Sequence, residues 1–346
     1  MVVEEYGGGD GKITHITLTN ASGASVTLST LGAGIVSVRV PDSRGEFADV
    51  VLGYAEAESW MNDGPCAGKV PGRFANRIAK GRFTLDGTEY SLAINNGPNA
   101  LHGGPTGFHN RIWELVEADD RKVTMEYRSA DGEEGYPGNV TVRATYRWSD
   151  RNELTLELTA RTDKATVINL TNHAYWNLGG NDSGSVLGHT LRLYASRYLP
   201  TDETLIPLPG EPQPVAGTPM DFTSEKALGK DINADFAALN YGKGYDNCWV
   251  TDGYEPGRMQ TAAVLRDPVS GRTLTVVTDQ PGVQIYTGNY LAGSPKSKSG
   301  REYADYDGVA IECQDFPDAP NRADYPSTVL RPGEEYRRHI AFRFGT

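Results

Sequence analysis

The chain has 346 residues, of which 38% are hydrophobic and 23% are charged, an ordinary balance for a globular protein with a large core. Its formal net charge of −12 argues against a nucleic-acid partner and against an anionic membrane surface, because Lys and Arg in excess bind both of these. The length fits either two average domains or one large all-β domain.

The cysteines and the first residues of the chain bear on its compartment. Cys66, Cys248 and Cys313 are too few and too scattered for a disulfide framework, and they include no CxxC metal spacing. We therefore expect a reducing compartment, the cytoplasm. The first residues have neither the basic nor the apolar region of a signal peptide, and no apolar run approaches the ~18–20 residues that span a bilayer.

Runs rich in β-branched and aromatic residues, separated by Gly, Ser and Asn turn signals, predict that most of the chain is β-strand. In chain order the runs span 13–19, 34–40, 123–128, 140–148, 153–161, 272–278, 282–290, 307–313 and 336–344. Residues 82–92 predict a hairpin with Asp86-Gly87 at its tip. Alternation on both sides of the polar turn at 149–152 predicts a second hairpin.

Helical signals are few. A short helix is expected at 56–61, and a modest pattern interrupted by Gly229 predicts helix within 223–240, with Ser224 as a possible cap. Many strands, few helices and 40 glycines together predict an all-β fold, a large β sandwich. Because no composition break marks a linker and no repeat recurs at a fixed period, residues 1–346 are expected to form one domain.

Residues 167–178, read as V-I-N-L-T-N-H-A-Y-W-N-L, have the composition of a strand with two different faces. The even positions from Ile168 onward are apolar apart from Asn172, whereas the odd positions from Asn169 carry Asn, Thr, His and Tyr. Alternate side chains of a strand point to the same side, so the polar row, which includes His173, is contiguous. On this stretch alone the row fits a solvated face or the wall of a site for a polar, uncharged ligand.

Two further motifs place polar donors near turns. Residues 71–78, P-G-R-F-A-N-R-I, offer the forked donors of Arg73 and Arg77, which suit a carboxylate, several sugar hydroxyls or a surface ion pair. In L-H-G-G, His102 precedes two glycines at a bend that lets backbone approach a ligand closely. His109, seven residues on, is a possible partner. Each of these residues also fits an incidental structural role.

Three stretches in the second half of the chain carry carboxylates or amides. Asp246, in G-Y-D-N, can cap its own turn or accept hydrogen bonds from vicinal hydroxyls. Gln284 and Tyr286 share one face of a strand, opposite Val283 and Ile285. Within V-A-I-E-C-Q-D-F-P, Glu312 lies on the face opposite Cys313. Burial would raise the pKa of Glu312 and improve it as a base, although an exposed edge strand would leave it ordinary.

Motifs for several other chemistries are missing from the sequence. It contains no phosphate-binding loop, no zinc-ligand spacing and no serine nucleophile elbow. His102 and His173 are far apart in the sequence, without H-x-H or H-E-x-x-H, so we expect no metal.

Six motifs in order resemble the aldose 1-epimerase (galactose mutarotase) family. They are G-R-F-A-N-R-I, L-H-G-G, T-N-H-A-Y-W-N-L, G-Y-D, Q-I-Y-T-G-N-Y and E-C-Q-D-F-P, and the likeness runs from about Gly34 to the C-terminus. The resemblance implies a β supersandwich and an enzyme that interconverts the anomers of a free aldohexose such as galactose or glucose, without cofactor or metal. We expect a monomer or a weak dimer.

By the same resemblance, Glu312 is the general base, His173 is the general acid, and Arg77, His102, Asp246 and Gln284 bind the sugar. Two alternatives stay open. One is a non-catalytic sugar-binding protein on the same fold, which the presence of both Glu312 and His173 disfavours. The other is a glycoside hydrolase that uses Glu312 and Asp246 as its carboxylate pair.

Overall fold

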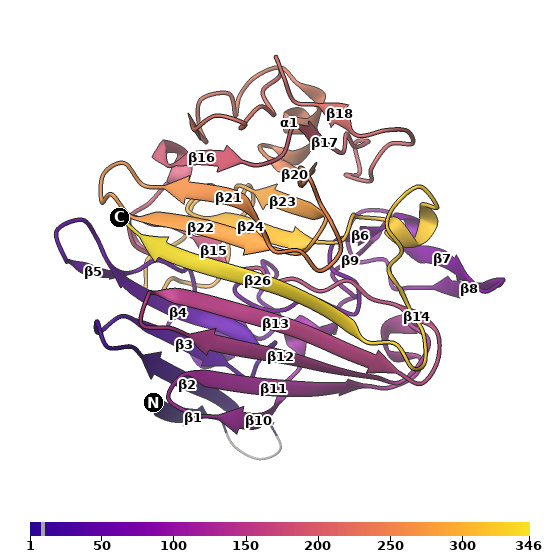
Figure 1. The fold of residues 1–346 in the computed structure, drawn as a ribbon, viewed down its shortest axis with the longest axis horizontal. Coiled ribbons are helices and arrows are strands. Elements are labelled where there is room, and N and C mark those ends of the chain that lie inside the picture. Colours follow the sequence, from indigo (N-terminus) through magenta and orange to yellow (C-terminus); the bar gives the residue numbers. More distant parts are fainter. Residues whose placement is uncertain (8–10) are drawn as a thin grey trace.

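The computed structural model describes residues 1–7 and 11–346, and three antiparallel sheets dominate it (Figure 1). The five-stranded sheet contains β1 (Val2–Tyr6), β2 (Ile13–Thr19), β3 (Ser25–Ser29), β4 (Gly34–Pro41) and β5 (Phe47–Asp49) in that order. The nine-stranded sheet contains, in spatial order, β10 (Glu114–Ala118), β11 (Lys122–Ser129), β12 (Val140–Trp148), β13 (Glu153–Thr162), β26 (Tyr336–Gly345), β22 (Thr273–Thr278), β21 (Gln260–Arg266), β16 (Thr190–Leu193) and β19 (Lys226–Ala227). The six-stranded sheet contains β15 (Tyr175–Trp176), β24 (Val309–Gln314), β23 (Gly282–Tyr286), β20 (Asp246–Val250), β17 (Arg197–Tyr198) and β18 (Gln213–Pro214).

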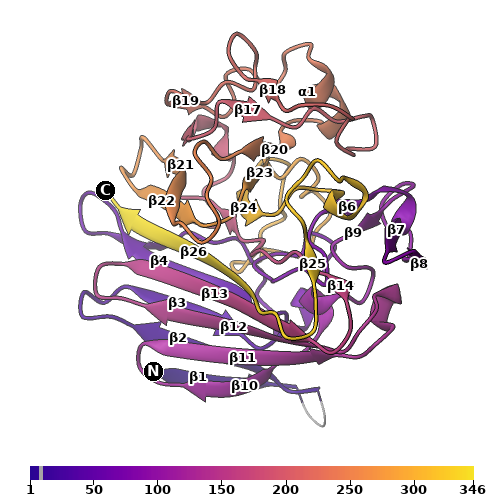
Figure 2. The same ribbon diagram turned by 45° about the vertical axis from the view of Figure 1, so that its right-hand side comes forward.

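Short elements complete the chain. Three two-stranded pairs join β6 (Arg77–Ile78) to β9 (Ala100–Leu101), β7 (Arg82–Leu85) to β8 (Thr88–Ser91), and β14 (Thr166–Val167) to β25 (Val329–Leu330). The α-helix α1 spans Ala237–Gly242, and 3₁₀ turns cover Ala57–Trp60, Ala79–Gly81, Phe108–Asn110, Glu133–Gly135, Val186–Gly188 and Ala319–Asn321. The β6–β9 and β7–β8 pairs lie at the right-hand side of the molecule (Figures 1 and 2).

The nine-stranded sheet packs against both other large sheets through one hydrophobic core. Against the five-stranded sheet, the Trp148 indole N–H of β12 donates to the Ala24 carbonyl at 3.1 Å. Against the six-stranded sheet, the ring centroid of Trp176 in β15 lies 5.0 Å from that of Phe342 in β26. Alternate apolar side chains on many of these strands face this shared layer, because successive side chains of a strand point to opposite sides.

The all-β prediction is confirmed, and so are the two hairpins. β7 and β8 pair around Asp86 and Gly87, which both have positive φ, as a type I′ turn requires. β12 and β13 pair in register from Val140 opposite Thr162 to Trp148 opposite Leu154. Strands also form over most of the other predicted runs, although β23 ends at Tyr286 and β24 begins only at Val309.

The prediction of a continuous strand at 167–178 is wrong. Only Thr166–Val167 and Tyr175–Trp176 are strand, and every residue from 166 to 178 is buried. The segment between them is held by loop backbone instead: the His173 amide donates to the Lys69 carbonyl, and the His173 carbonyl accepts from the Gly68 amide. The polar row is therefore not a solvated face.

The helix predicted within 223–240 is mostly wrong as well. The helix begins at Ala237 and ends at Gly242, while Lys226 and Ala227 add β19 to the edge of the nine-stranded sheet. Pairing with β16 outweighs the weak helical propensity around Gly229. At 56–61 the structure forms a 3₁₀ turn over Ala57–Trp60 rather than an α-helix.

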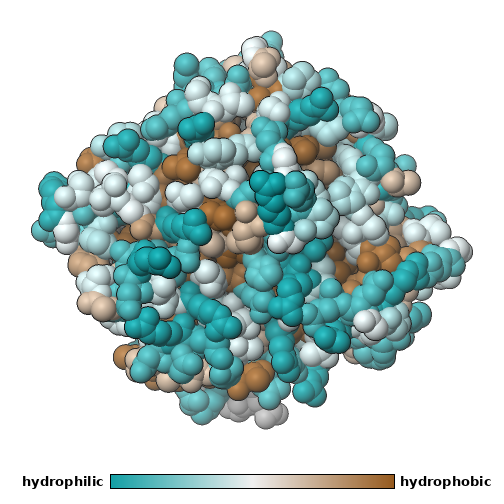
Figure 3. All heavy atoms as spheres, in the orientation of Figure 1, coloured by the Kyte–Doolittle hydropathy of each residue, from teal (hydrophilic) through white to brown (hydrophobic). Residues whose placement is uncertain are grey.

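The molecular surface seen in Figure 3 is mostly hydrophilic. Ion pairs lie along the nine-stranded sheet and its turns: Arg337 of β26 pairs with Glu157 of β13, and Arg121 pairs with Asp150 between two turns. Within the described residues, no helix is long and apolar enough to cross a membrane.

Candidate active site

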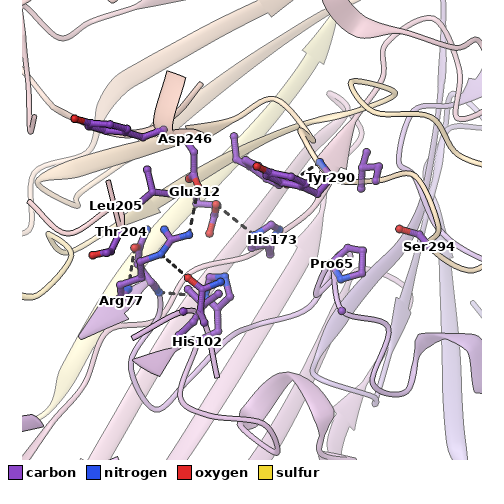
Figure 4. A pocket seen from close by; sticks show the side chains of 18 of the residues that line it. Pro65, Arg77, His102, His173, Thr204, Leu205, Asp246, Tyr290, Ser294 and Glu312 are labelled. Carbon is purple, nitrogen blue, oxygen red and sulfur yellow. Dashed lines mark hydrogen bonds and ion pairs between the residues drawn. The ribbon is translucent and has the colours of Figure 1, made fainter. Parts of the chain in front are cut away.

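A cleft of about 680 Å³ opens between the six-stranded sheet and the short β6–β9 pair (Figure 4). Five of the six residues predicted for the site line it: Arg77, His102, His173, Asp246 and Glu312. They come from five separate segments of the chain, and the sheets bring them together. The rest of the cleft wall includes the loops at 63–65, 96–98, 203–205 and 290–294.

His173 and Glu312 face each other in this cleft (Figure 4). Nε2 of His173 lies 3.4 Å from Oε1 of Glu312, and their side chains are only 5% and 3% exposed. Glu312 is in β24, where Cys313 points the other way into the main core, as the strand alternation predicts. Oε2 of Glu312 is buried and accepts no hydrogen bond from the described residues, so its hydrogen-bonding capacity is unused within the protein.

Burial sets the protonation of this pair. Desolvation raises the pKa of Glu312 well above its ordinary value, Asp246 raises it further, and Arg77 opposes the rise. Desolvation also lowers the pKa of His173 to about 4. Burial thus disfavours the charged form of each group taken alone. With one proton between them the pair has no net charge, whether both groups are neutral or they form an ion pair. The two groups are poised to hold one proton between them.

The short β6–β9 pairing places His102, because Arg77 of β6 lies opposite Leu101 of β9. The His102 amide donates to the Asn76 carbonyl, and Nδ1 of His102 accepts from the Asn76 amide at 3.1 Å. Desolvation lowers the pKa of His102 well below its usual range, so the ring is neutral. A neutral ring that accepts at Nδ1 carries its proton on Nε2, and His102 is therefore a hydrogen-bond donor.

The backbone around His102 explains the two glycines that follow it. His102 itself has a left-handed φ of 54°, and Gly103 has a φ of 80°. A Cβ on Gly103 would lie 2.0 Å from the Gly72 carbonyl oxygen. Only glycine fits there, so L-H-G-G and P-G-R-F-A-N-R-I interlock as one unit.

Asp246 is the centre of a second polar group. Its Oδ1 accepts from Nε2 of Gln284 at 2.7 Å, and its Oδ2 lies 3.4 Å from Nη2 of Arg77. Nε of Arg77 donates to Asn96 at 2.9 Å. Gln284 is buried and does not line the cleft, so it touches Asp246 from behind. This arrangement aims a carboxylate and a guanidinium into the cleft together.

The polar row at 167–178 divides between site and scaffold. Tyr175 lines the cleft beside His173, and its hydroxyl donates to the Pro65 carbonyl at 3.0 Å. The side-chain amide of Asn177 donates to the backbone carbonyls of Gly184 and Asp307. The side-chain amide of Asn169 donates to those of Ala75 and Asp315. The asparagines therefore secure the loops around the site.

Two residues offered by the sequence lie elsewhere. Arg73 is buried and donates to the Pro137 carbonyl and the Ser129 hydroxyl, so its interpretation as a possible ligand-binding group is wrong. His109 is also buried and does not line the cleft.

Several residues that line the cleft were not predicted from the sequence. Asp63, Asn96, Thr204 and Ser294 all lie in irregular loops. Asn76 stands inside the G-R-F-A-N-R-I motif, which is a usable signal. For the others, composition alone shows only turn residues, because their position depends on pairing between distant segments.

His102, His173 and Glu312 each have an atom that could coordinate a metal ion, and these three atoms lie within 4.8 Å of one another. The chemistry of His102 fits this poorly. Its Nδ1 accepts a backbone N–H, so its other nitrogen carries a proton and offers no lone pair to a metal. The absence of a metal stays a prediction.

Comparison with known proteins gives a consistent result. The profile of the aldose 1-epimerase family matches residues 14–343. Galactose mutarotase from Homo sapiens is 44% identical over 319 residues, covering 92% of this chain and 90% of its own, and aldose 1-epimerase from Escherichia coli K12 is 39% identical over 331 residues, covering 95% and 94%.

Solved structures agree. An aldose epimerase homologue from C. elegans superposes with a TM-score of 0.88 at 33% identity, covering 96% of this chain and 98% of its own. Galactose 1-epimerase from Lactobacillus acidophilus superposes with a TM-score of 0.86 at 28% identity, covering 99% and 98%. From its fold, its family profile and these relatives, the chain belongs to the aldose 1-epimerase family.

Proposed function

We propose that this protein interconverts the α and β anomers of a free aldohexose such as galactose or glucose, with Glu312 as general base and His173 as general acid. The observation that carries the proposal is the buried His173–Glu312 pair, 3.4 Å apart, in a cleft lined by polar groups. The relatives named galactose mutarotase and aldose 1-epimerase support the same activity.

The reaction needs one base and one acid. Glu312 takes the proton from the anomeric hydroxyl, C1 forms a carbonyl, the bond from C1 to the ring oxygen breaks, and His173 gives its proton to that oxygen. The open aldehyde then rotates about C1–C2. Reclosure on the other face reverses each transfer: protonated Glu312 returns a proton to the carbonyl oxygen, and neutral His173 takes one from the attacking hydroxyl. Each such proton transfer contributes on the order of 10²–10⁴-fold.

This cycle suits a pair that holds a single proton. Ring opening begins once the shared proton has moved from Glu312 to His173, which makes them a carboxylate and an imidazolium; beside the open aldehyde, both are neutral. Burial favours the neutral form, which accompanies the intermediate. Asp63 and Asp246 raise the pKa of His173, and Arg77 lowers that of Glu312, which favours the ion pair that begins the reaction. Asp246 also raises the pKa of Glu312, and Lys69 lowers that of His173, which opposes it.

The remaining polar groups hold the sugar. Asp246 accepts hydrogen bonds from vicinal hydroxyls, and Arg77 and His102 donate to ring and hydroxyl oxygens, where negative charge develops. Gln284 contributes to sugar binding indirectly, because its side-chain amide donates to the Asp246 carboxylate and orients it.

The two alternatives fit the site less well. A non-catalytic sugar-binding protein has no need for a buried acid–base pair. A hydrolase would need Asp246 as a second acid or nucleophile, but both of its oxygens already contact Gln284 or Arg77.

Polarimetry tests the proposal. Freshly dissolved α-D-galactose or α-D-glucose should reach its equilibrium rotation faster with the protein than in buffer. Methyl α-D-galactoside, which has no free anomeric hydroxyl, should keep its rotation. If no aldose responds, the proposal is wrong; release of sugar from the glycoside would favour a hydrolase.

The organisation and location of the chain are also proposals. A single domain is supported by the family match over residues 14–343 and by the core that the three large sheets share. A cytoplasmic location is supported by three buried cysteines that form no disulfide among the described residues. Sedimentation and cell fractionation would test, respectively, the expected monomer or weak dimer and the location.

A further inference from the structure

A buried ion pair lies in the cleft wall behind His173. Nζ of Lys69 is 2.8 Å from Oδ1 of Asp63, and both side chains are only 1% exposed. Asp63 belongs to the loop that lines the cleft through Asp63, Gly64 and Pro65, and Pro65 lies next to His173 in Figure 4. Burying two charges is costly, and a pair at such a position calls for an explanation.

The hydrogen bonds of this pair are saturated. Asp63 accepts from the Tyr54 hydroxyl, from the amides of Cys66 and Ala67, and from Lys69. Nζ of Lys69 also donates to the Trp60 carbonyl at 2.6 Å and to Asn110 at 3.2 Å. Because all its contacts are made within the protein, Asp63 is not a sugar-binding group, although it borders the cleft.

The pair is tied directly to the general acid. The His173 amide donates to the Lys69 carbonyl at 2.9 Å, and the Gly68 amide donates to the His173 carbonyl at 2.9 Å. The Tyr175 hydroxyl reaches the Pro65 carbonyl from the other side of the same loop. The ion pair thus fixes a loop whose backbone in turn fixes His173.

The charges of the pair also act on the ring. Groups that face or act on His173 are Glu312 from β24, Tyr286 from β23, Tyr175 from β15, Asp246 from β20, His102 after β9, His109 from the 3₁₀ turn at Phe108–Asn110, and Asp63 and Lys69 from the loop. Among the fixed charges, Asp63 raises the pKa of His173 and Lys69 lowers it, with Asp63 the larger influence.

We propose that Asp63, clamped by Lys69, is a positioning residue that orients His173 and stabilises its imidazolium form, while Lys69 limits that stabilisation. This inference rests on the proposed function, because it gives His173 the role of acid. It predicts that removing either charge changes the acid strength of His173 in opposite directions.

The test is a histidine titration by proton NMR on the unliganded protein, which does not depend on turnover. The His173 ring resonance, one of six histidines, is identified by its loss in His173→Asn. Asp63→Asn should lower the His173 pKa and Lys69→Met should raise it, each by on the order of one unit. The double variant, which removes both charges, should return close to the unsubstituted value.

Tyr54→Phe is the matched control, because it removes one hydrogen bond to Asp63 and no charge. Tyr54→Phe should leave the pKa of His173 unchanged. In polarimetry, Asp63→Asn should lower kcat at neutral pH more than it changes KM, and the acidic limb of its pH profile should follow the NMR shift.

The inference would be overturned if the His173 pKa shifted in the same direction in Asp63→Asn and Lys69→Met, or if Tyr54→Phe shifted it as much as Asp63→Asn does. The ion pair would then have only a structural role. Should Lys69→Met fail to fold, the shift of Asp63→Asn relative to Tyr54→Phe decides the matter. An unsubstituted protein without mutarotase activity refutes the proposed function instead, whatever the titrations show.

Discussion

Nε2 of His173 lies 3.4 Å from Oε1 of Glu312, although the two residues are 139 positions apart in the sequence. Both side chains are nearly excluded from water, so each favours its neutral form. The pair therefore behaves as one titrating unit that gains or loses its proton in shared steps.

The first prediction concerns pH. The pKa of His173 is lowered to about 4, and that of Glu312 is raised well above its ordinary value, because both groups are buried. Below about pH 4 the pair gains a second proton, which leaves Glu312 unable to act as a base. We therefore expect kcat/KM to fall on the acidic side at about pH 4. An inflection near the ordinary histidine value of about 6.5 would contradict this.

The second prediction removes each member of the pair. Glu312→Gln keeps the size of the side chain and His173→Asn keeps a polar group, but neither new side chain can exchange the proton, so each should lower kcat by at least ~100-fold. Polarimetry with a large protein excess measures the residual rate. Thermal unfolding should show folded variants, and near-normal turnover in either one would mean that another residue performs the step.

The third prediction uses the tautomer of His102. Its Nδ1 accepts from the Asn76 amide, so Nε2–H is the donor available to a ligand. Asn at this position can replace the Nδ1 acceptor, whereas Gln can extend a donor to the place of Nε2. His102→Asn should therefore lose roughly tenfold to a hundredfold in kcat/KM, and His102→Gln should lose less. The reverse order would place the essential contact at Nδ1.

The fourth prediction concerns the carboxylate held by Gln284 and Arg77. Asp246→Asn keeps the shape but weakens acceptance from sugar hydroxyls, so KM should rise with a smaller change in kcat. Initial rates over a range of galactose concentrations measure both constants. An unchanged KM would remove Asp246 from the binding site.

The fifth prediction is structural. Gly103→Ala would force a Cβ to within 2.0 Å of the Gly72 carbonyl oxygen at a left-handed φ of 80°. Gly132→Ala is the control, since Gly132 has a similar φ of 84° but nothing within 4 Å of the added atom. The control should lose about 1–2 kcal/mol in unfolding free energy, and Gly103→Ala distinctly more. Equal losses would mean that the interlock with Gly72 can shift freely.

Local patterns predicted much of the fold. The β12–β13 hairpin was visible because strict alternation persists on both sides of a polar turn, and Asp86-Gly87 marked the β7–β8 turn. The segment 167–178 misled because its alternation is typical of a strand, whereas its backbone groups pair with the loop at Gly68 and Lys69. Those contacts span about a hundred residues and leave no periodic trace in the sequence.

The site follows the same division. Five of the six predicted residues line the cleft because they lie in distinctive motifs, while Gln284 lies behind Asp246. The pair of Asp63 and Lys69 had no such signal, since both stand in a loop where a charged residue is usually exposed. Only the folded loop, with both charges buried and its backbone bonded to His173, brings them to this site.

The central claim is that Glu312 and His173 open and reclose a hemiacetal, and exchange spectroscopy tests it most directly. In an equilibrated galactose solution, proton NMR measures the rate at which the α and β anomeric signals interconvert. The protein should accelerate this exchange, and Glu312→Gln at equal concentration should leave it at the rate in buffer. Exchange that is equally fast with both proteins would contradict the claim.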